Sequence, residues 1–482
     1  MPFRLPALPS ICLLLAATAA SAAETERNWY TVLLDGRKIG QFESVREAHR
    51  DRVVTTQSLD IVLDRAGMRL ALGSSERAVE TREGVPLSFR NATSLAGSES
   101  VTEGRVRDGR IELTTTTGGV SQTRSIPWPD GALLAEGQRL AAMRAGLAPG
   151  TRFSLLAFQP SSVDAFAVDT SVGATETVEL PGGQRRLHRV EQTMALPGAP
   201  MTTTAWVDDA LVVHKLTMPL MGVELTLLAC DERCATAPNQ TSDVFDRTMA
   251  ASPRALGMAE RQDTLRYVLS TSGTGNAFAF PQTDEQSVRR DGTHWIVTVA
   301  REPATRSEEG PEPSQTQPGE WLQSDATEIV ALMKRATSGV DDAAARMQQL
   351  ETFVSDFIHT KSLGVGYASA LDVARDPQGD CTEHALLLAA LGRAAGIPTR
   401  VVTGLAYAPA FAGKNHVFVP HAWMQAWVDG HWRSYDAALD GFDAGHIALA
   451  VGDGDPWKFY SGLDLLGTLR LESVQVPARA TP

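Results

Sequence analysis

Apolar and polar residues alternate in short runs along the first half of the chain, and turn residues separate these runs. Such alternation is the pattern of half-buried β-strands. The runs on either side of Asp35-Gly36 are the plainest case, because this dipeptide favours a tight hairpin turn. One helical stretch, near residues 132–145, interrupts the strands. We therefore predict an antiparallel β-sheet domain over residues 24–240, built on a meandering sheet that is curved or closed.

A shorter β pattern follows at residues 264–270 and 294–300, with a region containing Gly and Asp between the two runs. We predict a small separate β domain over residues 255–302 from this pattern. The next stretch, residues 303–320, is rich in Pro, Ser, Gln and Glu. A segment of this composition cannot bury a core, so we interpret it as a linker.

Beyond the linker the apolar spacing changes to three and four residues, which is the period of an amphipathic helix. We predict a first helix over about residues 341–359; its apolar positions are Ala343, Met347, Leu350, Val354, Phe357 and Ile358. A second helix begins at Cys381. Its residues from Ala385 to Leu391 are apolar on every side, so we expect this helix to be buried.

Two strand-like runs follow the second helix, at residues 399–407 and 421–428. Pro398 separates helix from strands, because proline cannot continue a helix. This mixture predicts an α+β domain over residues 321–475. The fold class is thus multidomain, an antiparallel β-rich N-terminal region followed by an α+β C-terminal domain, and 482 residues are enough for it.

The N-terminus has the pattern of a cleaved export signal. Arg4 precedes the apolar run at residues 11–17, and the small residues Ala20-Ser21-Ala22 follow before an acidic Glu24. The run is too short to span a bilayer, and no later segment reaches the roughly 20 apolar residues that a spanning helix needs. We expect a signal peptide at residues 1–22 and a soluble mature protein in the periplasm or secreted.

Charge and composition narrow the function classes. The formal net charge is −13, and the basic clusters that phosphate backbones require are missing, so nucleic acid is excluded as a partner. The N-terminal β region clusters no titratable side chains that resemble a site. Its expected role is a scaffold, or a surface for a partner in the cell envelope.

Three of the four cysteines lie outside the signal. Cys230 and Cys234 are close enough for a small disulfide, which we favour over an unlinked pair or a metal site. No cluster of His or Cys accompanies them, and we predict neither a metal nor a cofactor. Cys381 is left over. It lies at the start of a helix, where the unsatisfied N–H groups favour a thiolate and lower the thiol pKa.

The dipeptide Asp429-Gly430 predicts a two-residue hairpin, in which Val428 pairs with His431. In that register His421 and Asp436 lie on one side of the hairpin as diagonal neighbours, with backbones roughly 7 to 8 Å apart. An imidazole and a carboxylate can meet across that gap. We therefore predict that Asp436 orients His421 and that His421 takes the proton of Cys381.

Gly379-Asp380-Cys381 before an apolar helix, the stretch 393–404, His421-Ala-Trp423 and then Asp436 together resemble the transglutaminase-like superfamily, which is papain-related in fold. The resemblance covers about residues 340–445. It implies that Cys381, His421 and Asp436 form a catalytic triad that acts on an amide or isopeptide bond through a thioester. Gln425 departs from the pattern, because many members have Glu there, and Ala437-Ala438 stands where Pro-Thr is common.

Three hypotheses follow from these observations. The first is an exported cysteine hydrolase of peptide-like amide bonds in a peptide or protein substrate. The second is an acyltransferase with the same triad, which passes the thioester to an amine instead of water. The third is a non-catalytic binding or scaffold protein of the envelope. The choice between the first two depends on the shape of the site, and the oxyanion-hole partner cannot be identified from spacing.

Other polar residues near the site are expected to be structural. We expect His384 to be an exposed or hydrogen-bonded first-turn histidine and Glu383 to complement the helix dipole. No partner for His446 can be argued from the sequence. The acidic residues after Asp436 lack the spacing of a calcium loop and are read as a solvated loop; they are Asp440, Asp443, Asp453 and Asp455. Asp436→Asn is expected to keep the fold and lower activity.

Overall fold

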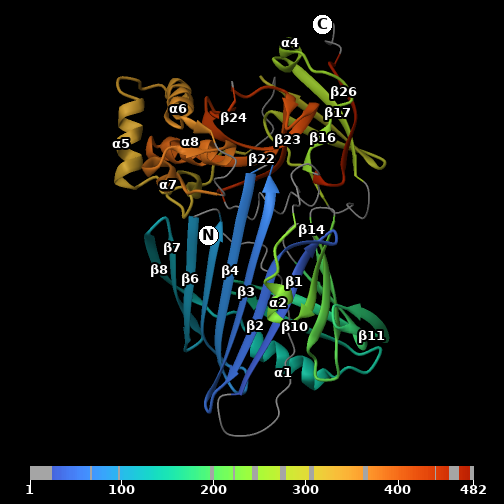
Figure 1. Cartoon of the computed structure of the whole chain (residues 1–482). Coiled ribbons are helices and arrows are strands. Elements are labelled where there is room, and N and C mark those ends of the chain that lie inside the picture. Colours follow the sequence, from blue (N-terminus) through green and yellow to red (C-terminus); the bar gives the residue numbers. More distant parts are fainter. Residues whose placement is uncertain are drawn as a thin grey trace. The chain divides into compact units, whose positions relative to one another are not determined.

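The computed structural model describes residues 24–65, 68–95, 98–195, 200–220, 223–240, 248–271, 278–302, 309–361, 367–439, 441–454 and 466–477. Apart from a few residues, the chain divides into two compact units, residues 2–242 and 243–482 (Figure 1). The predicted signal peptide lies outside the described residues. Within them, no helix has the length and apolar character needed to cross a membrane.

The N-terminal unit is one long meandering sheet, which confirms the predicted antiparallel β-rich region. Within the described residues it has fifteen strands, in the order β8-β7-β6-β5-β4-β3-β2-β1-β15-β14-β13-β12-β11-β10-β9. Pairing of β1 with β15 joins the two halves of the meander. The strands are β1 Glu24–Leu34, β2 Arg37–Ala48, β3 Arg52–Arg65, β4 Met68–Thr81, β5 Pro86–Leu95, β6 Ser98–Arg107, β7 Arg110–Thr117, β8 Val120–Pro127, β9 Ala132–Leu133, β10 Arg152–Gln159, β11 Asp164–Leu180, β12 Gly183–Met194, β13 Met201–Val207, β14 Val213–Leu220 and β15 Val223–Cys230.

Helix α1, Ala135–Ala145, is the predicted interruption of the strands, and charged groups attach it to the sheet. Glu80 accepts the backbone N–H groups of Glu136 and Gly137 at 2.6 and 2.9 Å. Arg46 on β2 donates two hydrogen bonds of 2.9 Å to the carboxylate of Glu136. These side chains are buried, and burial raises the pKa of Glu80 to about 7. Titratable groups therefore do cluster in this unit, where they anchor a helix.

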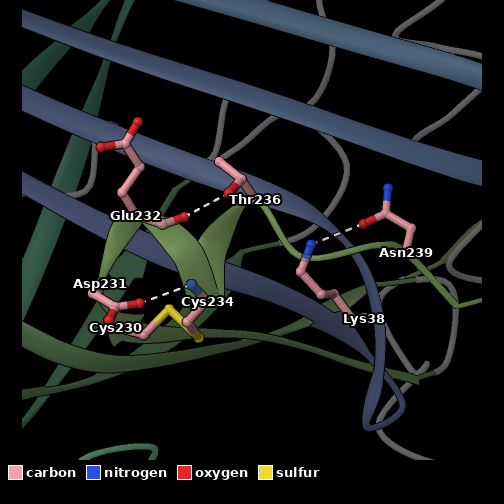
Figure 2. Close-up of a disulfide and its surroundings, with 7 residues drawn as sticks. All are labelled: Lys38, Cys230, Asp231, Glu232, Cys234, Thr236 and Asn239. Atoms are coloured by element: carbon pink, nitrogen blue, oxygen red, sulfur yellow. Dashed lines mark hydrogen bonds between the residues drawn. A yellow bond between two sulfur atoms is a disulfide. The ribbon is translucent and has the colours of Figure 1, made fainter.

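The disulfide predicted between Cys230 and Cys234 is present, with Cα atoms 5.9 Å apart (Figure 2). It links the end of β15 to the short helix α2, Glu232–Ala235. Asp231 caps this helix, since its Oδ1 accepts the N–H of Cys234 at 2.8 Å. Further along, Asn239 accepts a hydrogen bond of 2.9 Å from Lys38 Nζ. The chain after β15 is thus fixed against β2.

Replacing both Cys230 and Cys234 by Ser is expected to lower the free energy of unfolding of the N-terminal unit by about 1–2 kcal/mol. The reason is that a disulfide closing so short a loop removes little entropy from the unfolded chain. Chemical denaturation of the double variant and the wild type measures this difference. A loss above about 4 kcal/mol would show that the bond does more than restrict the unfolded chain.

In the part of the C-terminal unit that the structure describes, four principal helices pack beside three small sheets. Helices α5 Thr327–Ala336, α6 Ala343–Phe357 and α7 Ala370–Arg375 all contact the buried helix α8, Cys381–Ala394, which lies against β22 and β23 (Figure 1). One sheet has the order β16-β23-β22-β25 with β24 on β23, and another the order β18-β19-β17-β26. The bounds are β16 Ala250–Ala251, β17 Thr264–Thr271, β18 Gln286–Asp291, β19 His294–Ala300, β20 Thr360–Lys361, β21 Gln378–Gly379, β22 Thr399–Phe411, β23 Lys414–Val428, β24 His431–Tyr435, β25 His446–Gly452 and β26 Leu469–Gln475.

The segment at 255–302, predicted as a separate small domain, is part of this C-terminal unit. Its strand β17 pairs with β26, which lies some 200 residues later in the chain. Its buried side chains share one core with strands β22, β23 and β25; among them, Tyr267 lies against Phe418 with ring centroids 5.7 Å apart. The prediction was wrong here because the partner strand is too distant in sequence to be recognised from local pattern.

The predicted linker is described only from residue 309 onward. It contains a short 3₁₀ turn at Pro313–Thr316 with exposed side chains. At its end the chain is held in place, because Arg393 on α8 donates a hydrogen bond of 2.8 Å to the backbone oxygen of Gln317. Trp321 and Leu322 are buried directly after it.

Candidate active site

A capping box fixes the start of α8, where Cys381 lies. Asp380 Oδ1 accepts the N–H of Thr382 at 3.0 Å, and Glu383 Oε2 accepts the N–H of Asp380 at 2.8 Å. Gly379 is needed for this arrangement, since a Cβ at that position would lie 2.4 Å from the Cβ of Glu383. Cys381 is a partly exposed, reduced thiol in the first turn of the helix. The sequence Gly-Asp-Cys thus encodes a helix start with a thiol at its positive end.

Glu383 does more than complement the helix dipole. It is fully buried, and its Oε1 also accepts the N–H of Ala368 at 2.9 Å, which ties the preceding loop to α8. Burial and the neighbouring charge of Asp380 raise the pKa of Glu383 to about 8. The protonated form of this buried carboxyl group is thus favoured more than in an exposed glutamate, and its contacts are structural.

His384 is buried, and Asp380 is its hydrogen-bond partner. The ring Nδ1 lies 2.6 Å from the backbone oxygen of Asp380, which fits a neutral ring with its proton on Nδ1. Burial lowers the pKa of His384. The predicted hydrogen bond is present, and the prediction of an exposed ring does not hold.

The hairpin of β23 and β24 has the predicted register. Val428 pairs with His431, and the pairing continues to Met424 and Tyr435. His421 Nε2 lies 2.7 Å from Asp436 Oδ2, and both side chains are buried. A proton on Nε2 leaves the lone pair of His421 on Nδ1, the nitrogen that can accept a proton from a thiol.

Four donors surround the carboxylate of Asp436. Oδ1 accepts the backbone N–H groups of Ala438 and Leu439 at 2.9 and 3.2 Å. Oδ2 faces Nε2 of His421 at 2.7 Å and Nε2 of His446 at 3.0 Å. Burial alone would raise the pKa of Asp436, but the two imidazoles overcome it and hold the pKa well below its usual range. Asp436 therefore favours the anionic form more strongly than an exposed aspartate does.

The backbone of Asp436 is also held, by a carboxylate from α6. Glu351 Oε1 accepts the N–H of Asp436 at 2.7 Å. Burial raises the pKa of Glu351 to about 7. The position of Asp436 is therefore fixed by a helix as well as by the hairpin.

His446, for which the sequence offered no partner, lies between two carboxylates. Its Nε2 faces Asp436 Oδ2, and its Nδ1 lies 3.0 Å from the backbone oxygen and 3.3 Å from Oδ1 of Asp443. Asp443 is buried and forms an ion pair with Arg261, so its interpretation as part of a solvated loop was wrong. A histidine in an otherwise apolar strand, three residues after an aspartate, was the available signal.

An aromatic side chain from β23 packs against both histidines. Trp423 lies beside both rings, with centroids 6.2 Å from His421 and 5.2 Å from His446. Its ring passes over Gly404 on β22, where a Cβ would lie 3.0 Å from it.

Gln425 lies beside a buried carboxylate that comes from outside the predicted catalytic domain. Its Oε1 accepts a hydrogen bond of 2.8 Å from Arg400 Nε, and its Nε2 donates to Glu285 Oε2 at 3.0 Å. Glu285 also accepts the N–H of Ser434 at 2.8 Å. Burial raises the pKa of Glu285 to about 7. The segment before β18 thereby braces the hairpin that carries His421.

Within the described residues, one group of side chains offers atoms close enough to hold a metal ion. It consists of His421, Asp436 and His446, whose nitrogen and oxygen atoms lie within 4.8 Å of one another. Direct hydrogen bonds of 2.7 and 3.0 Å satisfy these atoms mutually. We therefore assign them as hydrogen-bonded pairs and not as metal ligands.

The free energy of unfolding of the C-terminal unit is expected to fall as the pH rises from about 6.5 to about 9. Burial alone would lower the pKa of His446, but its hydrogen bonds to Asp436 and Asp443 raise it to about 9. The folded protein thus keeps a proton that the unfolded chain releases above about pH 6.5. The stabilisation is fully present below about pH 6.5 and is lost as the pH rises through about 9. It amounts to about 3 kcal/mol.

Chemical denaturation between pH 6 and 9.5 measures this loss. The carboxyl groups of Glu285, Glu351 and Glu383 act in the same direction, because their raised pKa values also favour the folded state at lower pH. His446→Gln removes only the contribution of His446, so its profile should be flatter than that of the wild type. If the free energy of unfolding depended on pH in the same way in the wild type and in His446→Gln, the raised pKa assigned to His446 would be contradicted.

The site falls within a known family. Residues 330–437 match the family model described as the transglutaminase-like superfamily, which confirms the resemblance predicted from the sequence. A protein of Mycobacterium leprae, itself uncharacterized, is 36% identical over 104 residues. The match covers 20% of this chain and 37% of that relative, so the chain spans little more than a third of the relative's length. His446, Arg261 and Glu285 lie outside the matched residues.

Solved structures give weak overall matches. A protein from Cytophaga hutchinsonii, provisionally described as a cysteine protease, is 15% identical with a TM-score of 0.29; the match covers 46% of this chain and 88% of that one. A β-barrel-like protein from Brucella abortus, of a domain family of unknown function, is 14% identical with a TM-score of 0.33. The match covers 43% of this chain and 96% of that one. A protein from Parabacteroides distasonis, provisionally described as a protease, is 12% identical with a TM-score of 0.20. The match covers 74% of this chain and 69% of that one.

Proposed function

We propose that this chain, whose residues 330–437 form a transglutaminase-like core, is an exported cysteine-dependent hydrolase of peptide-like amide or isopeptide bonds. The observation that carries the proposal is the buried pair of His421 and Asp436, 2.7 Å apart, in the same core that presents Cys381 at the start of α8. A papain-like α+β arrangement of this core is part of the proposal, supported by the packing of α8 on β22 and β23. Export is supported by the sequence at residues 1–22.

Each residue has one role in the proposed reaction. Nδ1 of His421 takes the proton of Cys381, and the thiolate attacks the carbonyl carbon of the amide. The tetrahedral intermediate expels the amine, which receives its proton from His421, and a thioester to Cys381 remains. Water, deprotonated by His421, then hydrolyses the thioester and restores the thiol. Asp436 keeps the Nε2 proton of His421 in place and stabilises the imidazolium that forms in each half-reaction.

The start of α8 contributes electrostatically to this proposed reaction. Negative charge develops first on the sulfur and then on the carbonyl oxygen, and both lie near the positive end of the helix dipole. The capping box of Asp380 and Glu383 keeps that end of the helix rigid. Charge stabilisation therefore needs no reorganisation during the reaction.

A library of peptide amides with a thiol-reactive group tests the proposal and identifies the preferred peptide. Labelling confined to Cys381, followed by turnover of the matching amide with release of the free acid, supports a hydrolase. Incorporation of a labelled primary amine without release of the acid would show an acyltransferase instead. If Cys381 reacts no faster than an ordinary exposed thiol at pH 6, the non-catalytic scaffold function replaces both.

A further inference from the structure

Asp436 Oδ2 is shared by two imidazoles, although the proposed reaction uses only one of them. We propose that His446 is a positioning residue of the triad, which holds Asp436 and sets how strongly this carboxylate attracts the proton of His421. The inference rests on the proposed function, because it assigns a role in the same triad. It adds a fourth side chain, from β25, to which the sequence analysis could assign no partner.

His446 belongs to a chain of alternating charges that runs from the triad to α4, Met258–Arg261. Arg261 pairs with Asp443, Asp443 with His446, and His446 with Asp436, which faces His421. Every side chain in this series of charges is buried or nearly so. Each charge is thus compensated by its neighbours, as buried charges require.

Contacts outside the charge chain fix the loop that carries Asp443. The backbone oxygen of Arg261 accepts the N–H of Ala444 at 2.7 Å. The hydroxyl of Tyr267 on β17 donates a hydrogen bond of 2.6 Å to the backbone oxygen of Ala444. Both partners lie outside residues 330–437. The segment that the sequence suggested as a separate domain therefore helps to position the triad.

The charges that face His446 come from all the elements packed against it. They are the carboxylates of Asp436 and Asp443. Arg261 lies behind Asp443, and His421 lies on the other side of Asp436. The aromatic rings of Trp423 and Phe442 also contact His446. The doubly protonated ring donates from both nitrogens, which is what two carboxylate partners favour. Burial opposes this charge, yet the partners raise the pKa of His446 to about 9.

A positive His446 weakens the pull of Asp436 on His421. Removing that charge leaves the full negative charge of Asp436 directed at His421, so the imidazolium becomes harder to deprotonate. The thiol of Cys381 becomes less acidic for the same reason, since a nearby positive charge is lost. The pH profile for alkylation of Cys381 has two midpoints, one for the thiol and one for the imidazolium of His421. Both midpoints should therefore move to higher pH, by about one unit.

The test uses iodoacetamide, which reports on the thiolate of Cys381 without any substrate. Alkylation rates are measured from pH 4 to 10 in the wild type, His446→Gln and His446→Ala. His431→Gln is the matched control, because its ring faces the backbone oxygen of Asp429 at the hairpin turn and none of the charged groups around Asp436 pairs with it in the described residues. We expect both His446 variants to move the midpoints upward and the control to keep them. Folded variants with the midpoints of the wild type would overturn the proposal.

A second measurement keeps the proposal testable if the variants fail to fold. Histidine-labelled wild-type protein is titrated by NMR, and the imidazole signals are followed between pH 5 and 10. We expect one ring to titrate near pH 9 and the signals of His421 to move with it. If His446 loses its proton below pH 7, the proposal is wrong. Neither measurement depends on turnover, so a failure of the hydrolase proposal would be seen separately, as turnover that survives Cys381→Ala.

Discussion

We expect Cys381→Ala to abolish turnover and to leave the free energy of unfolding within about 1 kcal/mol of the wild type. The thiol is the only group at the start of α8 that can form a thioester, so its loss removes the reaction pathway. The fold should survive, because the capping box that starts α8 uses Asp380, Thr382 and Glu383 and not the thiol. Turnover of the peptide amide selected from the library, together with chemical denaturation, measures both effects.

The control for this variant is the double replacement of Cys230 and Cys234 by Ser, which removes the other two cysteines of the described residues. It should keep full activity, since neither residue belongs to the unit that carries the triad. Cys381→Ser adds a further comparison and should be nearly inactive, because a hydroxyl is far less acidic than a thiol. Turnover that persists in Cys381→Ala would remove the thiol from the mechanism.

Asp436→Asn is expected to lower both activity and stability. The sequence alone suggested that the fold would be unaffected, because asparagine has nearly the same shape. The structure changes this expectation, since the carboxylate accepts from two backbone N–H groups and faces two imidazoles. In either orientation the amide NH₂ of asparagine faces two donors. The expected cost in the free energy of unfolding is about 2–5 kcal/mol.

The activity loss of Asp436→Asn should be of order 10 to 10³ in kcat, because the wrong tautomer of His421 is favoured and its imidazolium is less stabilised. Asp429→Asn is the matched control. Asp429 is exposed at the hairpin turn with φ of 50°, a conformation that asparagine tolerates. Asp429→Asn should change neither the activity nor the free energy of unfolding by much. An Asp436→Asn variant as stable and active as the wild type would mean that another carboxylate orients His421.

The part of the site that could be predicted is the part that local rules determine. Asp429-Gly430 fixes a two-residue turn, and a fixed turn determines the register that brings His421 to Asp436. The helix start at Cys381 is encoded by the Asp380 cap and the glycine before it. The alternation of apolar residues likewise predicts the strands of the N-terminal unit.

The rest depends on pairings between segments distant in sequence. His446 reaches Asp436 because β25 pairs with β22, and nothing local to residues 446–452 indicates this partner. Arg261 and Glu285 come from the segment expected to be independent, which joins the site through the core it shares with β22 and β23 and through bonds to Asp443 and Gln425. The same limit applies to the N-terminal unit, where the pairing of β1 with β15 joins the two ends of a 200-residue meander.

The central claim is that His421 and Asp436 activate the thiol of Cys381, and the alkylation rate of Cys381 at pH 6 tests it most directly. An ordinary thiol with a pKa near 8.5 is almost entirely protonated at that pH and reacts slowly. The wild type should react at least about 10 times faster than such a thiol, and His421→Ala should lose this advantage. Equal, slow rates for the wild type and His421→Ala at pH 6 would contradict the account.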